Sequence, residues 1–374
     1  MTGVAGRAGD GGLPPHDHGA RRDRVRAMAA DAGADLLLVT DPVNVRYLSG
    51  FTGSNGQVRV ADRPGDDRLS TDDRYEARAA DEAPDLTVTL SRDAAGVALV
   101  LGRDGTLAVE AGHLSWAAGQ RLQTRAKQAD VQLLPTTGMV EQLRLVKDDA
   151  EVARLALACE LTQDALRWLF AEMVAVGRTE RELATLLERR FVDTGAEGVA
   201  FPSIVAGGVN AAVPHHAPTD RPLQRGDLLT VDCGALIDGY HADHTRTVAI
   251  GELDEELARV HALVAQAQEA GRHAVDAGVT GGEVDAAARE VIDRGGYGER
   301  FVHGTGHGVG LVIHEAPAVA KGSADRLEAG MALTVEPGIY LPGLGGVRIE
   351  DTIVVTADGP ARSLTDSPRQ LRVI

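Results

Sequence analysis

Two stretches of the chain, about a hundred residues apart, repeat one pattern of helix ends and helix starts. In each, a glycine ends a long segment, a Thr and a Glu follow with capping-box spacing, and another glycine ends the next segment. These residues are Gly177, Thr179, Glu182 and Gly195 in the first stretch and, at a constant offset of 101, Gly278, Thr280, Glu283 and Gly296 in the second. Chance is the alternative, because Gly and Thr are common at helix ends. A true duplication of two helices followed by strands would place a site between its halves.

A long helix is predicted before each of these capping boxes. Apolar residues recur at three- and four-residue steps from Val152 to Met173, which indicates one helix with Cys159 on its buried face. The second long helix is predicted over residues 254–277. Two cysteines are too few for a disulfide framework and suit a reducing compartment, so we expect a cytoplasmic protein.

The residues before the repeat alternate short apolar runs with helix-like stretches, which predicts an α/β domain over residues 21–138. The strand candidates are residues 36–39, 58–60, 86–90, 107–109 and 131–134. Residues 1–20 lack the apolar core of a signal peptide and are expected to form a disordered extension. The repeat-containing domain is then expected over 139–374.

Charge and hydropathy exclude several classes of partner. The 38 Lys and Arg against 55 Asp and Glu give a net charge of −17, which repels nucleic-acid backbones and anionic lipid. No apolar run reaches the roughly 18–20 residues that a membrane span needs. We therefore expect no nucleic-acid and no membrane partner.

A hairpin is predicted over residues 227–250, with a two-residue turn at 238–239. In its register Asp232 pairs with Thr245, and Asp243 lies two residues from Thr245 on the same face. Asp232 and Asp243 are therefore expected to be diagonal neighbours, roughly 7–8 Å apart at the backbone.

A second hairpin is predicted between residues 333–336 and 347–355. If its loop is symmetric about Gly343, Glu336 lies directly opposite Glu350. Like charges at such positions destabilise a sheet unless something positive lies among them. The alternative is two unrelated pairs of surface acids.

Three histidines favour a metal site. His303, His307 and His314 lie within twelve residues, among glycines that allow close backbone approach. One imidazole with four carboxylates suits Mn²⁺ and can be occupied by Co²⁺ or Zn²⁺. Two cations about 3.5–4 Å apart would neutralise the carboxylates and could activate a water.

These residues stand in motifs that resemble the dinuclear metallopeptidase family containing methionine aminopeptidase, aminopeptidase P and prolidase. The matching strings are Val-Asp232-Cys-Gly-Ala, Ala-Asp243-His-Thr-Arg-Thr, His303-Gly-Thr-Gly-His307-Gly-Val-Gly, Val-Glu336-Pro-Gly-Ile-Tyr340 and Val-Arg348-Ile-Glu350-Asp. The resemblance covers about residues 140–374. It implies a pita-bread catalytic domain of mixed α/β and α+β character with a pseudo-twofold repeat. It also implies two divalent metal ions, most often Mn²⁺, held by Asp232, Asp243, His307, Glu336 and Glu350.

The N-terminal half resembles the creatinase/prolidase-type domain in its aminopeptidase P-like form. The strings that carry this likeness are Tyr47-Leu-Ser-Gly-Phe51-Thr-Gly-Ser-Asn-Gly56 and Leu69-Ser-Thr-Asp72-Asp-Arg-Tyr75. Such a domain commonly contributes to dimer contacts and narrows the substrate entrance, so a homodimer is expected.

The activity that the resemblance implies is removal of the N-terminal residue from short peptides with proline second, by a hydroxide bridging the metals. Glu336, His314 and His215 are the implied catalytic residues, with Glu336 as general base. His215, His303, His314 and Arg348 are the implied substrate-binding residues; a structural role for Arg348 is the alternative. Because side chains alternate along a strand and these two residues neighbour functional positions, His216 and His244 are expected to point away from the site.

Two further interpretations are open. Prolidase, which cleaves only Xaa-Pro dipeptides, is the nearest, and a non-catalytic peptide-binding protein of the same fold is the second. Loss of metal ligands would mark the latter, and all five ligand positions are filled here.

Overall fold

The computed structural model describes residues 12–91 and 105–374, which form two compact units. The N-terminal unit comprises residues 15–144, and the C-terminal unit comprises residues 145–374 together with 12–14. The division therefore falls six residues after the predicted boundary at 138/139.

The predicted disordered extension is too long at its C-terminal end. Residues 1–11 lie outside the described part, but helix α1 (His18–Asp31) already begins within the predicted extension. Asp17 caps this helix by accepting a hydrogen bond from the backbone N–H of Ala20. Polar residues that looked like a solvated tail are thus a helix start.

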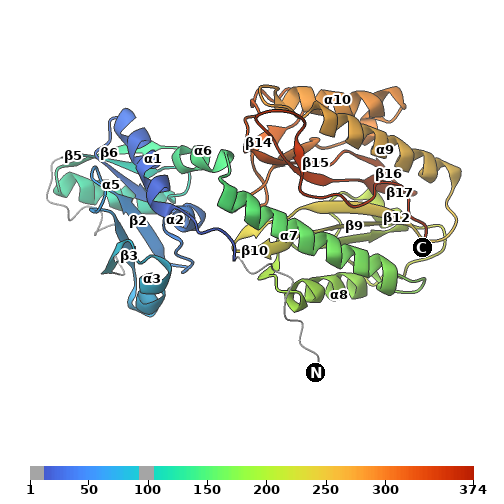
Figure 1. The fold of residues 1–374 in the computed structure, drawn as a ribbon, viewed down its shortest axis with the longest axis horizontal. Helices are drawn as coiled ribbons and strands as arrows, with labels where there is room; N and C mark the ends of the chain where they lie inside the picture. The colour runs from blue at the N-terminus through green and yellow to red at the C-terminus, as the bar shows by residue number, and fades with distance from the viewer. Residues whose placement is uncertain (1–11, 92–104) are drawn as a thin grey trace. The chain divides into compact units, whose positions relative to one another are not determined.

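The N-terminal unit is built on one six-stranded sheet with the order β4-β3-β2-β1-β5-β6 (Figure 1). Its strands are β1 (Leu36–Val39), β2 (Gly56–Val60), β3 (Arg68–Thr71), β4 (Thr87–Leu90), β5 (Gly105–Glu110) and β6 (Val131–Thr136). Its α-helices are α1, α2 (Pro42–Ser49), α3 (Glu76–Glu82), α5 (Trp116–Gln128) and α6 (Met139–Leu145). All five predicted strands are present. β3, α1 and α2 were not predicted, and the α/β class is confirmed.

Two helix pairs organise the C-terminal unit, and they begin and end alike. The helices are α7 (Asp149–Trp168) with a π-helical last turn (Leu169–Met173), α8 (Glu180–Asp193), α9 (Glu255–Ala274) and α10 (Gly281–Arg294). Thr179 and Thr280 both form complete capping boxes, with Glu182 and Glu283. The four glycines of the repeat all have positive φ, between 86° and 104°. The matched residues therefore begin and end equivalent helices in both halves.

Equivalent hydrogen bonds extend the repeat beyond the helices. The N–H of Gly177 donates to the carbonyl of Leu223, and the N–H of Gly278 donates to that of Leu327. Because the backbone following each glycine pairs with a later segment of its own half, the duplication holds in three dimensions. Figure 1 shows the α9–α10 pair and the α7–α8 pair on different sides of the strands of this unit.

Short strands between the helix pairs carry the residues of interest. They are β7 (Gly198–Val199), β8 (Ile204–Gly207), β9 (Leu228–Cys233), β10 (Ala235–Ile237), β11 (Tyr240–His241), β12 (His244–Ala249), β13 (Gly306–Gly308), β14 (Glu315–Val319), β15 (Ala332–Val335), β16 (Gly338–Leu341), β17 (Gly345–Arg348), β18 (Asp351–Val354) and β19 (Arg362–Ser363). They form sheets with the orders β12-β9-β8, β11-β10-β7, β14-β13-β15-β18-β19 and β16-β17.

Both predicted hairpin registers are confirmed. In the first hairpin Asp232 lies opposite Thr245, and both turn residues, Asp238 and Gly239, have positive φ. In the second, β15 pairs with β18 and β16 with β17 in one continuous register centred on Gly343. The segment expected to be a loop is therefore mostly strand, and the strand pairing is interrupted at Glu336 and Glu350.

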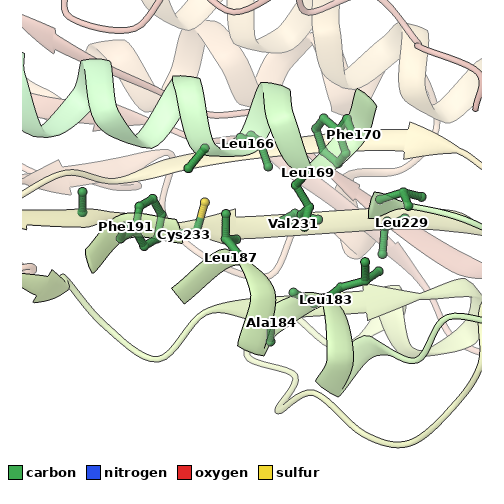
Figure 2. Packing of buried hydrophobic residues seen from close by; sticks show 14 of the residues in the cluster. Leu166, Leu169, Phe170, Leu183, Ala184, Leu187, Phe191, Leu229, Val231 and Cys233 are labelled. Carbon is green, nitrogen blue, oxygen red and sulfur yellow. The ribbon is translucent and has the colours of Figure 1, made fainter. Parts of the chain in front are cut away.

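A buried apolar cluster joins the first helix pair to β9. Figure 2 shows Leu166, Leu169 and Phe170 from one long helical segment, four residues of α8 and three of β9 meeting in one layer. The four residues of α8 are Leu183, Ala184, Leu187 and Phe191, and those of β9 are Leu229, Val231 and Cys233. Cys159 and Cys233 are free and buried in this cluster, as predicted for Cys159. The packing fixes β9, and with it the position of Asp232 at its end.

Within the described residues, none of the helices combines the length and the apolar character that crossing a membrane requires.

A buried histidine in α9 makes the stability of the C-terminal unit depend on pH. Burial lowers the pKa of His261 from 6.5 to about 4, and its Nε2 lies 3.3 Å from the carbonyl of Thr247. Between these two pKa values only the unfolded chain takes up the proton, so stability is fully present above pH 6.5 and falls as pH drops towards 4. We expect His261 to account for a loss of about 3 kcal/mol over this range.

Denaturant unfolding at pH 7 and pH 4.5 measures this effect, and His261→Gln should remove most of the His261 contribution while keeping a donor to Thr247. His273→Gln, exposed on the same helix, is the matched control. An unaltered pH slope in the His261→Gln protein would contradict the assignment.

Candidate functional site

The C-terminal unit contains a cavity of about 520 Å³, within the range typical of small-molecule sites. Eight of the nine predicted site residues line it: Asp232, Asp243, His215, His303, His307, His314, Glu336 and Arg348. The ninth, Glu350, is 1% exposed, and its carboxylate lies close to this wall. One ligand atom each from Asp243, His307 and Glu350 fall within 4.8 Å of one another.

The two halves of the repeat both contribute to this cluster. Asp232 is the second-last residue of β9 and Asp243 precedes β12 in the first half, while the glutamates lie at the breaks of the second hairpin. The halves are joined where the N–H of Glu350 donates to the carbonyl of Thr245 and the hydroxyl of Thr245 donates to Glu350 Oε2 at 2.7 Å. The expected location between duplicated halves is therefore the one observed.

Glycines on β13 bring His307 close to its neighbours. A Cβ on Gly306 would lie 1.9 Å from the carbonyl oxygen of Thr334, and one on Gly308 would lie 2.0 Å from that of Ala316. Because no larger residue fits there, the strand can approach both adjoining strands closely. His307 Nε2 then lies 3.2 Å from Glu336 Oε1 and 3.5 Å from Asp243 Oδ2.

His307 and Glu336 behave as a charged pair. Burial alone would raise the pKa of Glu336, but the hydrogen bond from His307 and the charges of His307, His303 and Arg348 lower it to about 2. Burial would lower the pKa of His307, and its interaction with Glu336 raises it instead. The positive charge of His307 is therefore already used to neutralise Glu336.

Of the other three carboxyl groups, Asp232 pairs with Arg348, whereas Asp243 and Glu350 lack such compensation. Burial, followed by repulsion from neighbouring carboxylates, raises the pKa of both Asp243 and Glu350 well above the usual range. Glu350 Oε1 and Asp232 Oδ1 are buried without a hydrogen-bond partner among the described residues. Unpartnered buried carboxylate oxygens beside an imidazole fit divalent cations, because such ions replace protons and supply the missing positive charge.

The remaining histidines surround the cavity. His303 Nε2 lies 2.8 Å from the hydroxyl of Tyr340, and its ring packs edge-on against Phe301. The ring of His314 stacks edge-on against that of His307, with centroids 4.4 Å apart. Burial lowers the pKa of both His303 and His314, so both rings are neutral donor–acceptor groups near pH 7.

Arg348 is committed mainly to protein atoms. Its Nη2 donates to Asp232 Oδ2 at 2.6 Å, its Nη1 to the hydroxyl of Tyr340 and the carbonyl of Pro214, and its Nε to Thr245. Four of its five N–H groups are used in this way. The arrangement favours the structural alternative that the sequence left open: Arg348 holds Asp232 in place.

Some residues of the cavity escaped the sequence analysis. His216 lines it, contrary to expectation, because residues 214–218 are not a strand and the alternation argument does not apply. His244 does not line the cavity and is fully buried. The apolar wall, which includes Phe201, Ile204 and Ile313, comes from separate loops and strands and leaves no periodic signal.

The duplicated α+β unit, with acidic and imidazole side chains gathered between its halves, defines the class of pita-bread metallopeptidases. The chain belongs to metallopeptidase family M24, whose model matches residues 153–357. A second model, the creatinase/prolidase N-terminal domain, matches residues 21–146. The predicted family and fold are thus confirmed, and enzymes of this family use divalent metal ions.

Several known proteins are similar over nearly the whole chain. An Xaa-Pro dipeptidase of Pyrococcus furiosus is 35% identical over 351 residues, covering 94% of this chain and 99% of that protein. The structure of an Xaa-Pro dipeptidase from Bacillus anthracis has a TM-score of 0.90 at 36% identity, covering 96% and 100%. That of an X-Pro aminopeptidase from Thermotoga maritima has a TM-score of 0.87 at 36% identity, covering 94% and 99%.

These relatives correct the predicted main activity. The names Xaa-Pro dipeptidase and prolidase recur among the matched proteins and structures, whereas aminopeptidase names are fewer. The aminopeptidase interpretation rested on a string around Phe51. That string lies in a domain that the dipeptidase of Pyrococcus furiosus shares, since the match spans 99% of that protein. The string therefore does not separate the two activities, and aminopeptidase as the main activity is wrong.

Proposed function

We propose that this protein is an Xaa-Pro dipeptidase that depends on two divalent cations, with Mn²⁺ as the working metal. The observation that carries the proposal is the cavity itself, in which three carboxylates and the imidazole of His307, with Glu350 beside them, meet four further histidines and an apolar wall. The names of the relatives support the choice of dipeptides over longer peptides.

In this proposal the cations are held by Asp232, Asp243, His307, Glu336 and Glu350. When bound, they supply Lewis acidity and lower the pKa of a water molecule. Hard oxygen ligands with one imidazole favour Mn²⁺ over the softer metals.

Glu336 is proposed to move the proton. Its carboxylate faces the cavity and is ionised, so it can accept a proton from the attacking water and pass it to the leaving prolyl nitrogen. Thr334 donates a hydrogen bond to Glu336 Oε1 at 3.2 Å, which limits the rotation of the side chain. His314, on the same wall, can donate a hydrogen bond to the carbonyl oxygen as negative charge develops there.

The walls suit a prolyl residue after the cleaved bond. Proline lacks an amide N–H and has a fixed φ near −65°, so a site that extends the backbone ladder cannot hold it. Phe201, Ile204 and Ile313 offer apolar surface to the ring, and the faces of His215 and His303 complete the wall.

A peptide panel with Mn²⁺ tests the specificity. If the protein is a dipeptidase, we expect kcat/KM for Gly-Pro to exceed that for Gly-Pro-Gly by about 100-fold, a size of discrimination that differences in substrate contacts commonly give. Gly-Ala is the control for the prolyl requirement. Equal or faster cleavage of the tripeptide would contradict dipeptidase activity, and equal cleavage of Gly-Ala would contradict prolyl specificity.

A further inference from the structure

A carboxylate outside the proposed metal ligands is buried beside the cavity. Glu180, the first residue of α8, has a fully buried side chain. Its Oε1 accepts hydrogen bonds from the N–H of Gly207 at 2.8 Å and from the amide of Asn210 at 2.9 Å. Its Oε2 accepts from the N–H and hydroxyl of Thr219, at 3.0 and 2.6 Å, and lies 2.8 Å from His216 Nε2. Five donors therefore converge on one side chain.

These donors belong to one continuous stretch of chain. They are spread over residues 207–219, from the end of β8 to the loop after Thr219, and Glu180 contacts both ends of that stretch. Between the ends lie Pro214, His215 and His216, which line the cavity. Apart from the short 3₁₀ helix η3 (Gly208–Ala212), this stretch has no regular structure to fix it. The carboxylate of Glu180 anchors both ends of this wall, while Arg348 Nη1 donates to the carbonyl of Pro214 in its middle.

The ionised form is the one that suits this role. Burial raises the pKa of Glu180, but the hydrogen bonds from Gly207, Thr219, His216 and Asn210 outweigh burial and lower it. Hydrogen bonds to an ionised carboxylate are roughly twice as strong as neutral ones. Loss of the charge would leave several buried donors without a good acceptor.

The pseudo-twofold repeat shows that this anchor is not a general part of helix capping. The position equivalent to Glu180 in the second half is Gly281, which follows the capping residue Thr280 in the same way. A Cβ on Gly281 would lie 2.0 Å from the carbonyl oxygen of Ala318, so no side chain fits there. Glutamate at this position therefore serves the cavity wall of the first half only.

We propose that Glu180 is a positioning residue that supports substrate binding in the cavity by holding the wall that carries His215. Its effect on catalysis rests on the proposed dipeptidase function, whereas its effect on the wall does not. Among the described residues, none of the hydrogen bonds of Glu180 joins it to a proposed metal ligand, so its loss should change substrate binding rather than the chemical step.

Kinetics and hydrogen exchange on Glu180→Gln with both metals bound test this inference. We expect KM for Gly-Pro to rise by about tenfold to hundredfold, because a small misplacement of a positioning group has effects of that size. The value of kcat should stay within about threefold, the pattern expected when uniform binding is lost. Metal content per chain should equal that of the unsubstituted protein. Amide exchange across residues 207–219 should be at least about tenfold faster.

Glu182→Gln is the matched control, since Glu182 lies in the same first turn of α8 but is exposed and serves only the capping box. It should alter neither KM nor exchange in residues 207–219. Thr219→Val removes one hydrogen-bond donor to Glu180 and is the milder variant to use if Glu180→Gln does not fold. This variant should also raise KM.

The outcomes separate this inference from the proposed function. Unchanged exchange in residues 207–219 in folded Glu180→Gln, or in Thr219→Val if that variant alone folds, would overturn the anchoring role whatever the activity. Faster exchange with an unchanged KM would overturn the role in substrate binding. Failure of the unsubstituted protein to cleave Gly-Pro would instead refute the proposed function, and the exchange measurement would still decide the anchor.

Discussion

Replacement of Glu336 by glutamine is expected to lower kcat for Gly-Pro by about 10³-fold or more, because proton transfer by a positioned side chain contributes about 10²–10⁴-fold and Glu336 is also a proposed metal ligand. Glutamine keeps the size of the side chain and its contact with Thr334 but can take neither the proton nor the charge. Steady-state kinetics and elemental analysis of the same preparation measure both roles.

Glu328→Gln is the control for this experiment, since Glu328 is exposed a few residues before β15. It should retain normal kcat and metal content. If Glu336→Gln kept more than about a tenth of the activity, general acid–base catalysis by this residue would be ruled out, because such catalysis contributes at least about 10²-fold. Full metal content with lost activity would keep the proton-transfer role and remove the ligand role.

Exhaustive chelation is expected to abolish activity and to lower the melting temperature by about 10 °C. A ligand present at about 1,000 times its Kd stabilises the native state by about 4 kcal/mol, and 1 kcal/mol shifts the melting temperature of a unit of this size by about 2–4 °C. The physical cause is repulsion among Asp232, Asp243, Glu336 and Glu350, which His307 and Arg348 offset only in part.

Addition of Mn²⁺ to the chelated protein should restore both activity and melting temperature, and NaCl at equal ionic strength is the control for screening. A protein that carries less than a tenth of a metal ion per chain, by elemental analysis, and keeps full activity would refute metal dependence. Restoration by Zn²⁺ or Co²⁺ but not by Mn²⁺ would refute only the proposed metal.

Much of the site could be predicted because its residues lie on hairpins. Side chains alternate strictly along a strand, so one turn, at Asp238 and Gly239, fixed the pairing of Asp232 with Thr245. The symmetric turn at Gly343 fixed the second ladder in the same way. The capping boxes at Thr179 and Thr280 were predictable because each hydrogen bond spans only three residues.

What could not be predicted depends on contacts between distant segments. His216 faces the cavity because Glu180, 36 residues earlier, accepts its hydrogen bond, and no local pattern encodes that pairing. Arg348 reaches Asp232 across 116 residues, a contact that favours the structural one of the two roles that the sequence left open. The proposed preference for dipeptides could not be predicted from the ligand motifs, since the same five ligand types serve several peptidases.

The bond between Thr245 and Glu350 joins residues 105 positions apart, and it lies at the junction of the two halves. Neither half contains all five proposed ligands, so during folding the acidic cluster does not exist until both halves have formed and docked. Docking of the two halves is therefore opposed by two terms. One is the loop-closure entropy of this long-range contact, and the other is the repulsion among the carboxylates. Cations that bind only the completed cluster would therefore act on the final assembly of the unit rather than on the formation of either half.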